Sequence, residues 1–364
     1  MRVLLAGGGT GGHLFPAVAL GQLLLKEVVG AQILFVGTKR GIEYRLLPQL
    51  QLPLALVDMV GVVGRGWRGK LELVPKLTRS LIQAQGILRK FKPDLVVGFG
   101  GYASVPVLLA AKFLHIPYLI HEQNAIPGVS NKFLAKGAAR ICVSYPDTLT
   151  CFPRSKATLT GNPLRQGFDQ IPETLPVPGQ VLVFGGSRGA RAINEALVAC
   201  LPELLRWAGP PQILHQTGED DFDMVQAAYA AAGYPAATIV PFIDDMAGAY
   251  SGSALVICRA GATTLAELTV CGRPAILIPF PHATGDHQNA NARALEQAGA
   301  AVVLQQRDLT ALRLATELRI LLADREELQL MAMRARSLAR PDAARKILVE
   351  CRNLVPFSSP AEVV

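Results

Sequence analysis

Glycine-rich turns stand at three places in the sequence where a phosphate group could be bound. The first, GGGTGG at 7–12, follows the apolar run RVLLA and fits the pattern G-x-G-x-x-G. The second spans 98–101 and the third 185–189, each after another apolar run. Glycine lets backbone N–H groups approach an anion, and the helix after such a turn adds its positive N-terminal end. Three turns of this kind predict that the protein handles a diphosphate.

The first turn alone suggests a dinucleotide-binding enzyme, but the expected acidic partner is missing. Such an enzyme carries an acidic residue about 20 positions beyond the turn, at the end of the next strand, to bind ribose hydroxyls. Here the run QILFVG is followed by Thr38, Lys39 and Arg40. The two basic residues would suit a 2′-phosphate, so an NADP-dependent oxidoreductase stays open as an alternative. No G-x-x-x-x-G-K-[ST] motif is present, which argues against a P-loop NTPase.

The elements around the turns predict two similar α/β domains. Short apolar, β-branched runs alternate with helical segments along most of the chain, as in parallel sheets covered by helices on both faces. The second half repeats the first, since QVLVFGGSRGAR has the form of RVLLAGGGTGGH. We therefore predict two Rossmann-like, doubly wound parallel-sheet domains that face each other across a cleft. Ligands of such sheets bind at the carboxyl ends of the strands, where the glycine turns lie.

A proline-rich segment, GNPLRQGFDQIPETLPVPGQ, separates the two halves and is interpreted as the connection between them. The predicted organisation is a first domain at 1–162, a linker at 163–179, a second domain at 180–340 and a C-terminal tail at 341–364 that is able to return to the first domain.

Composition sets the class of protein. The chain has 364 residues, half of them hydrophobic, which suffices for two cores. Glycines interrupt the N-terminal apolar run too early for a signal peptide, and no uninterrupted apolar run is long enough to span a bilayer. The six cysteines show no C-x-x-C pairing, so we expect reduced thiols. The net charge of +8 points to a polyanionic partner.

Most of this charge lies in the stretch 65–92, where eight Lys or Arg residues stand against one Glu. Leucines and one tryptophan interleave with them at roughly helical spacing, which suits an anionic bilayer surface. The alternative is a helix that packs its apolar face on the sheet and leaves its basic face in solvent. Nucleic acid is not expected as a partner, because stacking aromatics are sparse. The predicted membrane-surface residues are Trp67, Lys70, Lys76, Leu77, Arg79 and Leu81.

Seven motifs, in order along the chain, together resemble the bacterial MurG family: GGGTGGHLFPA, HEQN, GNPLR, GGSRGARAIN, FIDDM, CRAGATTLAEL and DHQNANA. The resemblance implies the GT-B glycosyltransferase fold. It also implies inverting transfer of N-acetylglucosamine (GlcNAc) from UDP-GlcNAc to the 4-hydroxyl of N-acetylmuramic acid in lipid I, the undecaprenyl-diphospho-linked pentapeptide precursor. The product is lipid II, used in peptidoglycan synthesis. The family further implies a peripheral enzyme on the cytoplasmic face of the inner membrane, with anionic phospholipid and other peptidoglycan-synthesis proteins as partners.

The resemblance assigns a donor site mainly to the second domain. Ser187 matches the position that binds the donor diphosphate, Ile243 the one whose backbone addresses uracil, and Glu267 the carboxylate that accepts both ribose hydroxyls. Gln288 matches a glutamine that holds the transferred sugar. The full predicted donor set is Thr10, Gly11, Gly12, Asn124, Arg165, Ser187, Ile243, Ala262, Thr263, Thr264, Leu265, Glu267 and Gln288.

His13 directly follows the first glycine turn, and we expect it at the N-terminal end of the helix that begins there. It could serve there as a hydrogen-bonding residue or as a catalyst. Inverting transfer needs a base for the attacking hydroxyl. The positive end of a helix favours the neutral imidazole that can take a proton. We predict His13 as this base, with Glu122 as the alternative. The acceptor diphosphate is expected on Gly9, Gly100, Gly101 and Tyr102.

No obligatory metal or other cofactor is expected. The glycine-turn motifs carry no D-x-D metal clamp, and DFD at 221–223 is expected at an exposed helix start. Turn amides and helix ends would instead stabilise the leaving group. A noncatalytic protein that binds UDP-sugars or a lipid surface remains as a second alternative.

Overall fold

The computed structural model describes residues 1–59 and 73–357, so the predicted membrane residues Trp67 and Lys70 lie outside the described residues. The chain forms two compact units. The first unit combines Met1–Arg165 with Arg340–Val364, and the second unit is Gln166–Ala339. Each unit has its own parallel sheet and its own hydrophobic core.

The sheet of the first unit has seven strands, all parallel, in the order β3-β2-β1-β4-β5-β6-β7. The strands are β1 Arg2–Ala6, β2 Gln32–Gly37, β3 Leu54–Leu56, β4 Leu95–Gly98, β5 Tyr118–Glu122, β6 Arg140–Val143 and β7 Ala157–Leu159. The central strands are almost wholly buried because helices cover both faces, which explains their continuous apolar sequences.

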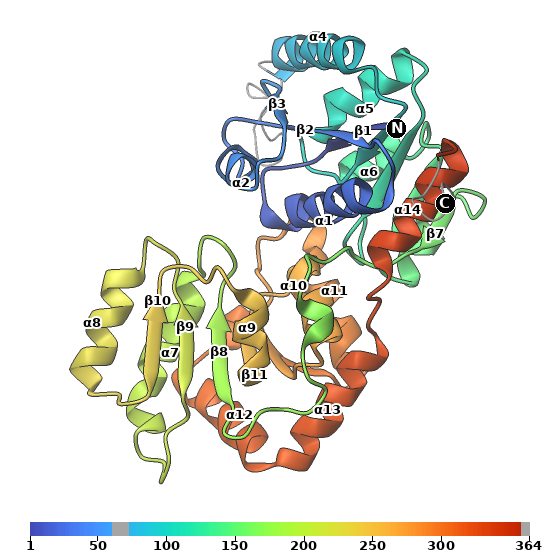
Figure 1. Cartoon of the computed structure of the whole chain (residues 1–364). Helices are drawn as coiled ribbons and strands as arrows, with labels where there is room; N and C mark the ends of the chain where they lie inside the picture. Colours follow the sequence, from blue (N-terminus) through green and yellow to red (C-terminus); the bar gives the residue numbers. More distant parts are fainter. Residues whose placement is uncertain (60–72, 358–364) are drawn as a thin grey trace. The chain divides into compact units, whose positions relative to one another are not determined.

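The helices of the first unit are α1 Gly11–Glu27, α2 Glu43–Gln49, α4 Leu73–Phe91, α5 Ser104–Phe113, α6 Val129–Leu134 and α14 Ala343–Leu354, with the short 3-10 helix η1 Asp147–Cys151. One core cluster lies under α1 and α14, and the other lies under α4, α5 and α6. Helix α14, from the end of the chain, lies beside α1 (Figure 1), where Ile347, Leu348 and Cys351 enter the core.

The second unit has a six-stranded parallel sheet in the order β10-β9-β8-β11-β12-β13. Figure 1 labels β10, β9, β8 and β11 of this sheet. Its strands are β8 Gln180–Phe184, β9 Ile213–Gln216, β10 Ala237–Val240, β11 Ser253–Cys258, β12 Ala275–Leu277 and β13 Ala301–Val303. Its helices are α7 Arg191–Leu204, α8 Phe222–Ala232, α9 Met246–Ser251, α10 Ala262–Cys271, α11 His287–Gln297, α12 Ala311–Ala323 and α13 Arg325–Ser337, with the 3-10 helices η2 Phe168–Gln170, η3 Thr284–Asp286 and η4 Gln306–Asp308.

The structure draws the unit boundaries differently from the sequence. Most of the predicted linker, 163–179, belongs to the second unit, and the chain returns to the first unit at Arg340 rather than after it. The physical reason is that the proline-rich segment is fixed to the second unit: Leu175 is buried in its core, and the Arg336 guanidinium donates to the Pro172 carbonyl at 2.8 Å.

Candidate active site

The first glycine turn leads directly into α1, as predicted. Thr10 is the N-cap with an extended backbone, and His13 is the third residue of the helix. The Thr10 hydroxyl and His13 Nδ1 lie 3.1 Å apart, within hydrogen-bond distance. His13 is half-buried, so its ring remains partly accessible at the carboxyl edge of the sheet.

The second glycine turn packs against the first. Gly100 and Gly101 have φ values of +83° and +75°, which a side chain would strain. A Cβ on Gly100 would lie 3.3 Å from His13 Cδ2, and one on Gly101 would lie 2.7 Å from the Gly8 carbonyl. A Cβ on Gly9 would lie 3.1 Å from the Tyr102 ring. The structure therefore brings together the residues predicted for the base and for the acceptor diphosphate.

A buried carboxylate, Glu43, supports the first glycine turn, and no sequence motif marks it. Glu43 begins α2 and is fully buried. Its Oε2 accepts the N–H of Gly9 at 2.8 Å, and its Oε1 accepts the N–H of Thr38 at 2.8 Å. A Cβ at Gly8, Gly37 or Gly41 would collide with this carboxylate, which explains those three glycines. The Gly9 N–H predicted to bind a phosphate is thus bound to the protein.

Glu122, the alternative base, holds the loop that follows β5. One of its oxygens accepts the backbone and side-chain N–H groups of Asn124 at 3.0 and 3.2 Å. The other accepts Gly128 N at 2.9 Å and Asn131 Nδ2 at 2.8 Å. Its exposed fraction is 1%. A carboxylate with four donors in place is suited to fixing Asn124 and this loop.

A buried histidine network connects the same strand to the end of the first unit. His121 Nε2 lies 2.9 Å from the Gly161 carbonyl, and Gln123 Nε2 donates both to His121 Nδ1 at 3.1 Å and to the Phe99 carbonyl at 2.8 Å. Complete burial lowers the pKa of His121 to about 4, so the ring is neutral at pH 7. The HEQN motif is thus largely a structural support for the second glycine turn.

Arg165, a member of the predicted donor set, is the last residue of the first segment of the first unit. Its guanidinium carbon lies 4.3 Å from the centre of the Phe15 ring on α1, a cation–π geometry. Gly11 is needed nearby, because a Cβ there would lie 2.9 Å from the same ring. The two predicted donor residues Arg165 and Gly11 therefore meet through Phe15.

In the second unit, Ser187 stands on the exposed third glycine turn. It is not a helix cap, because the N-cap of α7 is Ala190. Gln216 Nε2 donates to the Gly186 carbonyl of this turn at 2.8 Å. In a neighbouring network, Asn194 on α7 donates to the Thr217 carbonyl at 2.9 Å and to Asp221 at 2.8 Å, and His215 Nε2 lies 3.1 Å from Asn194 Oδ1. Burial lowers the pKa of His215 to about 4.

The residues expected around the nucleoside cluster on α10. Ala262, Thr263, Thr264 and Leu265 form its first turn, where the Leu265 N–H donates to the carbonyl of the N-cap Gly261 at 3.0 Å, and Glu267 follows on the same helix. Glu267 is only 6% exposed, and the Tyr250 hydroxyl donates to its Oε2 at 3.1 Å. Ile243 is half-buried in the loop between β10 and α9. Tyr250 was not predicted, because no motif marks it.

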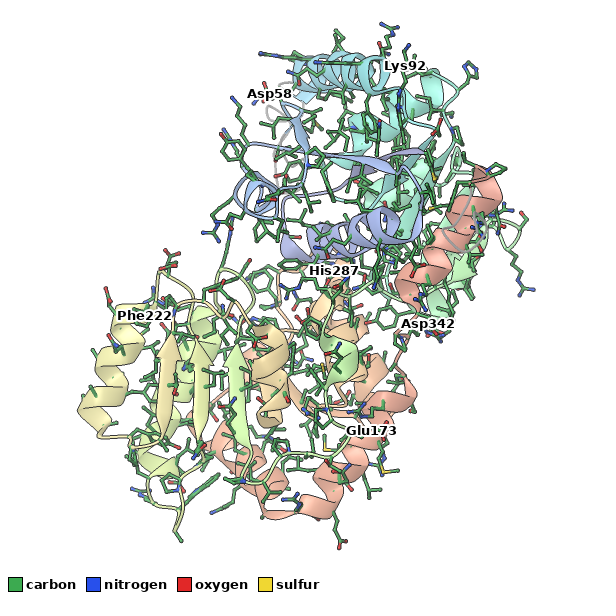
Figure 2. The ribbon with its side chains drawn as sticks, viewed as in Figure 1. Asp58, Lys92, Glu173, Phe222, His287 and Asp342 are labelled. Carbon is green, nitrogen blue, oxygen red and sulfur yellow. The ribbon has the colours of Figure 1, made fainter. Side chains whose placement is uncertain are left out.

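Gln288 lies in the first turn of α11, directly after His287, which Figure 2 labels. Its Oε1 accepts the Phe280 N–H at 2.9 Å, so the oxygen of the amide is engaged within the protein. Asn289 is bound at both ends of its amide, by Asp286 and by Gln305. Gln288 therefore has a donor to offer a sugar oxygen.

The structure of helix α4 contradicts the membrane prediction for two of its leucines. Leu77 and Leu81 pack against the core of the first unit rather than facing outward. The exposed face carries Arg79, Ile82 and Arg89, and Lys92 follows the helix (Figure 2). Ile82 is 65% exposed. Lys76 is half-buried. None of the helices that the structure describes is long and apolar enough to cross a bilayer.

Within 1–59 and 73–357, no group of three or more His, Cys, Asp or Glu side chains is arranged to hold a metal ion. In the DFD sequence, Asp221 is the N-cap of α8 and its Oδ2 accepts from Asn194. All six cysteines are free thiols, five of them buried.

Two twisted parallel-sheet units, each with a glycine turn at the carboxyl edge of its first strand, define a glycosyltransferase of the GT-B fold. The N-terminal domain model of glycosyltransferase family 28 matches residues 3–143, and the C-terminal domain model matches residues 180–347. The chain belongs to this family and, within it, to the MurG group.

Individual relatives and a solved structure support the same assignment to the MurG group. A UDP-N-acetylglucosamine--N-acetylmuramyl-(pentapeptide) pyrophosphoryl-undecaprenol N-acetylglucosamine transferase of Syntrophotalea carbinolica is 53% identical over 97% of this chain and 99% of its own length. The protein of the same name from Geobacter metallireducens is 47% identical over 96% and 98%. The crystal structure of Acinetobacter baumannii MurG matches with a TM-score of 0.76 and 36% identity, over 97% of this chain and 99% of that one. The alternative interpretation, that the protein is an NADP-dependent oxidoreductase, is therefore wrong.

Proposed function

We propose that this protein transfers GlcNAc from UDP-GlcNAc to the 4-hydroxyl of N-acetylmuramic acid in lipid I, with inversion, and so forms lipid II for peptidoglycan. The observation that carries the proposal is identity of 53% along nearly the whole chain with a transferase named for that reaction. The placement of Glu267 beside the N-terminal turn of α10 adds support from the site itself.

The donor nucleotide binds to the second unit in this proposal. Turn amides near Ser187 take the diphosphate, the backbone at Ile243 addresses uracil, and the Glu267 carboxylate accepts the ribose hydroxyls, because a carboxylate is an acceptor with several lone pairs. Gln288 donates its amide N–H to the sugar, since its oxygen is held by Phe280.

His13 acts as the general base. With the Thr10 hydroxyl accepting Nδ1–H, the neutral imidazole uses Nε2 to take the proton of the attacking hydroxyl, whose oxygen displaces UDP from the sugar. Inversion follows from this single displacement. Glu122 is the weaker candidate for this role, because four donors already occupy its oxygens.

The second glycine turn and Tyr102 bind the acceptor diphosphate in this account, beside the base. Gly9 contributes its backbone shape rather than its N–H, which Glu43 accepts. The reaction needs no obligatory metal, because turn amides and the N-terminal ends of helices stabilise the charge of the leaving UDP.

The protein acts at the cytoplasmic face of the inner membrane as a peripheral protein. The exposed basic face of α4, with Arg79, Arg89 and Ile82, supports binding to anionic phospholipid. Contacts with other peptidoglycan-synthesis proteins belong to the same proposal.

Product identification tests the proposed reaction. The purified protein, UDP-GlcNAc and a lipid I analogue should yield a product heavier by one N-acetylhexosamine, attached at the 4-position. Binding of UDP-GlcNAc without this product would favour a noncatalytic UDP-sugar-binding protein.

A further inference from the structure

Tyr250 is a buried residue with a contact to the carboxylate proposed to bind ribose. It lies on α9 with no exposed surface, and its hydroxyl donates to Glu267 Oε2 at 3.1 Å. Burial raises the pKa of Tyr250 well above its ordinary value, and the adjacent Glu267 carboxylate raises it further. The hydroxyl therefore keeps its proton at physiological pH and acts as the donor.

The ring of Tyr250 is fixed from several sides. Phe168 and Phe184 contact it edge-on, with ring centroids 5.9 and 6.1 Å away. The buried Arg273 donates from Nε to the Tyr250 carbonyl at 2.7 Å and from Nη1 to the Cys271 carbonyl, at the end of α10, at 2.9 Å. Helices α9 and α10 are thus joined through Arg273 at the backbone and through Tyr250 at the Glu267 side chain.

Tyr250 lies on the helix that follows Ile243, which is proposed to address uracil, and contacts Glu267, which is proposed to bind ribose. Helix α9 begins three residues after Ile243, and α10 carries both the N-terminal turn and Glu267. A carboxylate has about four acceptor positions, so the bond to Tyr250 is compatible with bonds to two ribose hydroxyls, and it restrains the orientation of the carboxylate. Loss of that bond removes one restraint on the terminal torsion of the Glu267 side chain.

We propose that Tyr250 is a positioning residue that orients the Glu267 carboxylate toward the ribose and thereby sets the preference of the site for ribonucleotides over deoxyribonucleotides. This inference rests on the proposed donor site. A site built to hydrogen-bond a hydroxyl rejects the analogue that lacks it, because its own polar group is left unpaired. The strength of that rejection depends on how firmly the polar group is held.

The test is the ratio of dissociation constants for 2′,3′-dideoxy-UDP and UDP, measured by calorimetry on the full chain. We expect a ratio of at least about 10 in the wild type, because two hydrogen bonds to a charged group are lost. In Tyr250→Phe, which keeps the ring between Phe168 and Phe184, we expect the ratio to fall roughly 5-fold through weaker UDP binding. In Glu267→Gln the ratio should fall as well, and adding Tyr250→Phe to it should change nothing further.

A matched control is Tyr234→Phe, which removes another hydroxyl from the second unit, one that donates to the Pro211 carbonyl at 2.8 Å. Its ratio should equal that of the wild type. A wild-type ratio near 1 would overturn the proposed ribose role of Glu267. A large wild-type ratio that Tyr250→Phe leaves unchanged would overturn the present inference alone.

If Tyr250→Phe does not fold, site-specific 3-fluorotyrosine at position 250 replaces it. This residue keeps the volume and the hydroxyl but makes it a stronger donor. The ratio should then shift from the wild-type value, and an unchanged ratio would contradict the positioning role.

Discussion

The Glu43 carboxylate accepts the Gly9 N–H at 2.8 Å, so a turn whose pattern indicates anion binding already carries an anion of the protein. Glu43→Gln should destabilise the first unit by about 1–3 kcal/mol, because the amide nitrogen must then face the N–H of either Gly9 or Thr38. Hydrogen exchange should show weaker protection of β1 and β2 and unchanged protection of β8.

The matched control for Glu43 is Glu195→Gln, which removes an exposed carboxylate paired with Arg191. Exposed pairs contribute little, so protection should stay at the wild-type level. If Glu43→Gln leaves β1 and β2 as protected as the control does, the carboxylate does not hold the turn.

His13→Ala should lower kcat at least about 10²-fold, the usual scale of general base catalysis. Binding of UDP should change little, because Ser187, Ile243 and Glu267, which are proposed to bind the nucleotide, belong to the second unit. Rapid-quench turnover and calorimetry with UDP measure the two quantities. Turnover near that of the wild type would remove His13 from the mechanism.

Glu122→Gln separates the two candidates for the base. Because Glu122 accepts from Asn124 and Asn131, we expect a higher KM for the acceptor and a pH dependence of kcat that keeps its wild-type shape. Loss of the low-pH limb in this variant, with that limb retained in His13→Ala, would assign the base to Glu122 instead.

Acid should destabilise both units through buried histidines. The pKa values of His121 and His215 are lowered to about 4, so each binds a proton in the unfolded chain before the folded one. Stability is therefore complete above about pH 6.5 and falls as pH drops toward 4, by up to about 3 kcal/mol for each histidine. Hydrogen exchange at pH 7 and pH 5, corrected for intrinsic exchange rates, measures this loss of stability in β5 of the first unit and β9 of the second.

In His121→Gln the loss of protection on acidification should shrink in β5 and persist in β9. An equal loss in both strands of the variant would contradict the assignment of the acid response to His121.

Binding to vesicles tests the basic face of α4. Neutralising Lys76, Arg79 and Arg89 together should weaken sedimentation with anionic vesicles, since each basic residue near the surface contributes about 1 kcal/mol. Neutralising three exposed arginines of the second unit, Arg206, Arg307 and Arg319, is the matched control and should have less effect. If vesicle binding depends neither on the anionic lipid content nor on the three α4 substitutions, this face of α4 is not the membrane-binding surface.

Much of the fold was predictable, because central parallel strands need continuous apolar sequences. The runs RVLLA and QVLVF become β1 and β8 as expected. The edge strands β3, β7 and β13 have three residues each and carry no comparable pattern. Helical spacing on α4 identified its apolar face, but spacing alone does not say whether core or membrane covers it, and Leu77 and Leu81 face the core.

The site was predictable where residues follow a motif and not where a supporting side chain arrives from another element. His13 and Glu267 stand in recognisable sequences. Glu43 reaches the first turn from α2, and Tyr250 reaches Glu267 from α9, so only the packing of the elements reveals them.

The most direct test of the central claim is the rate of UDP release from UDP-GlcNAc in the presence of a lipid I analogue. We predict steady release that requires the acceptor, is much slower with UDP-glucose or UDP-N-acetylgalactosamine, and persists after treatment with EDTA. Release that does not depend on the acceptor, or that is equally fast with each of these sugar nucleotides, would contradict it.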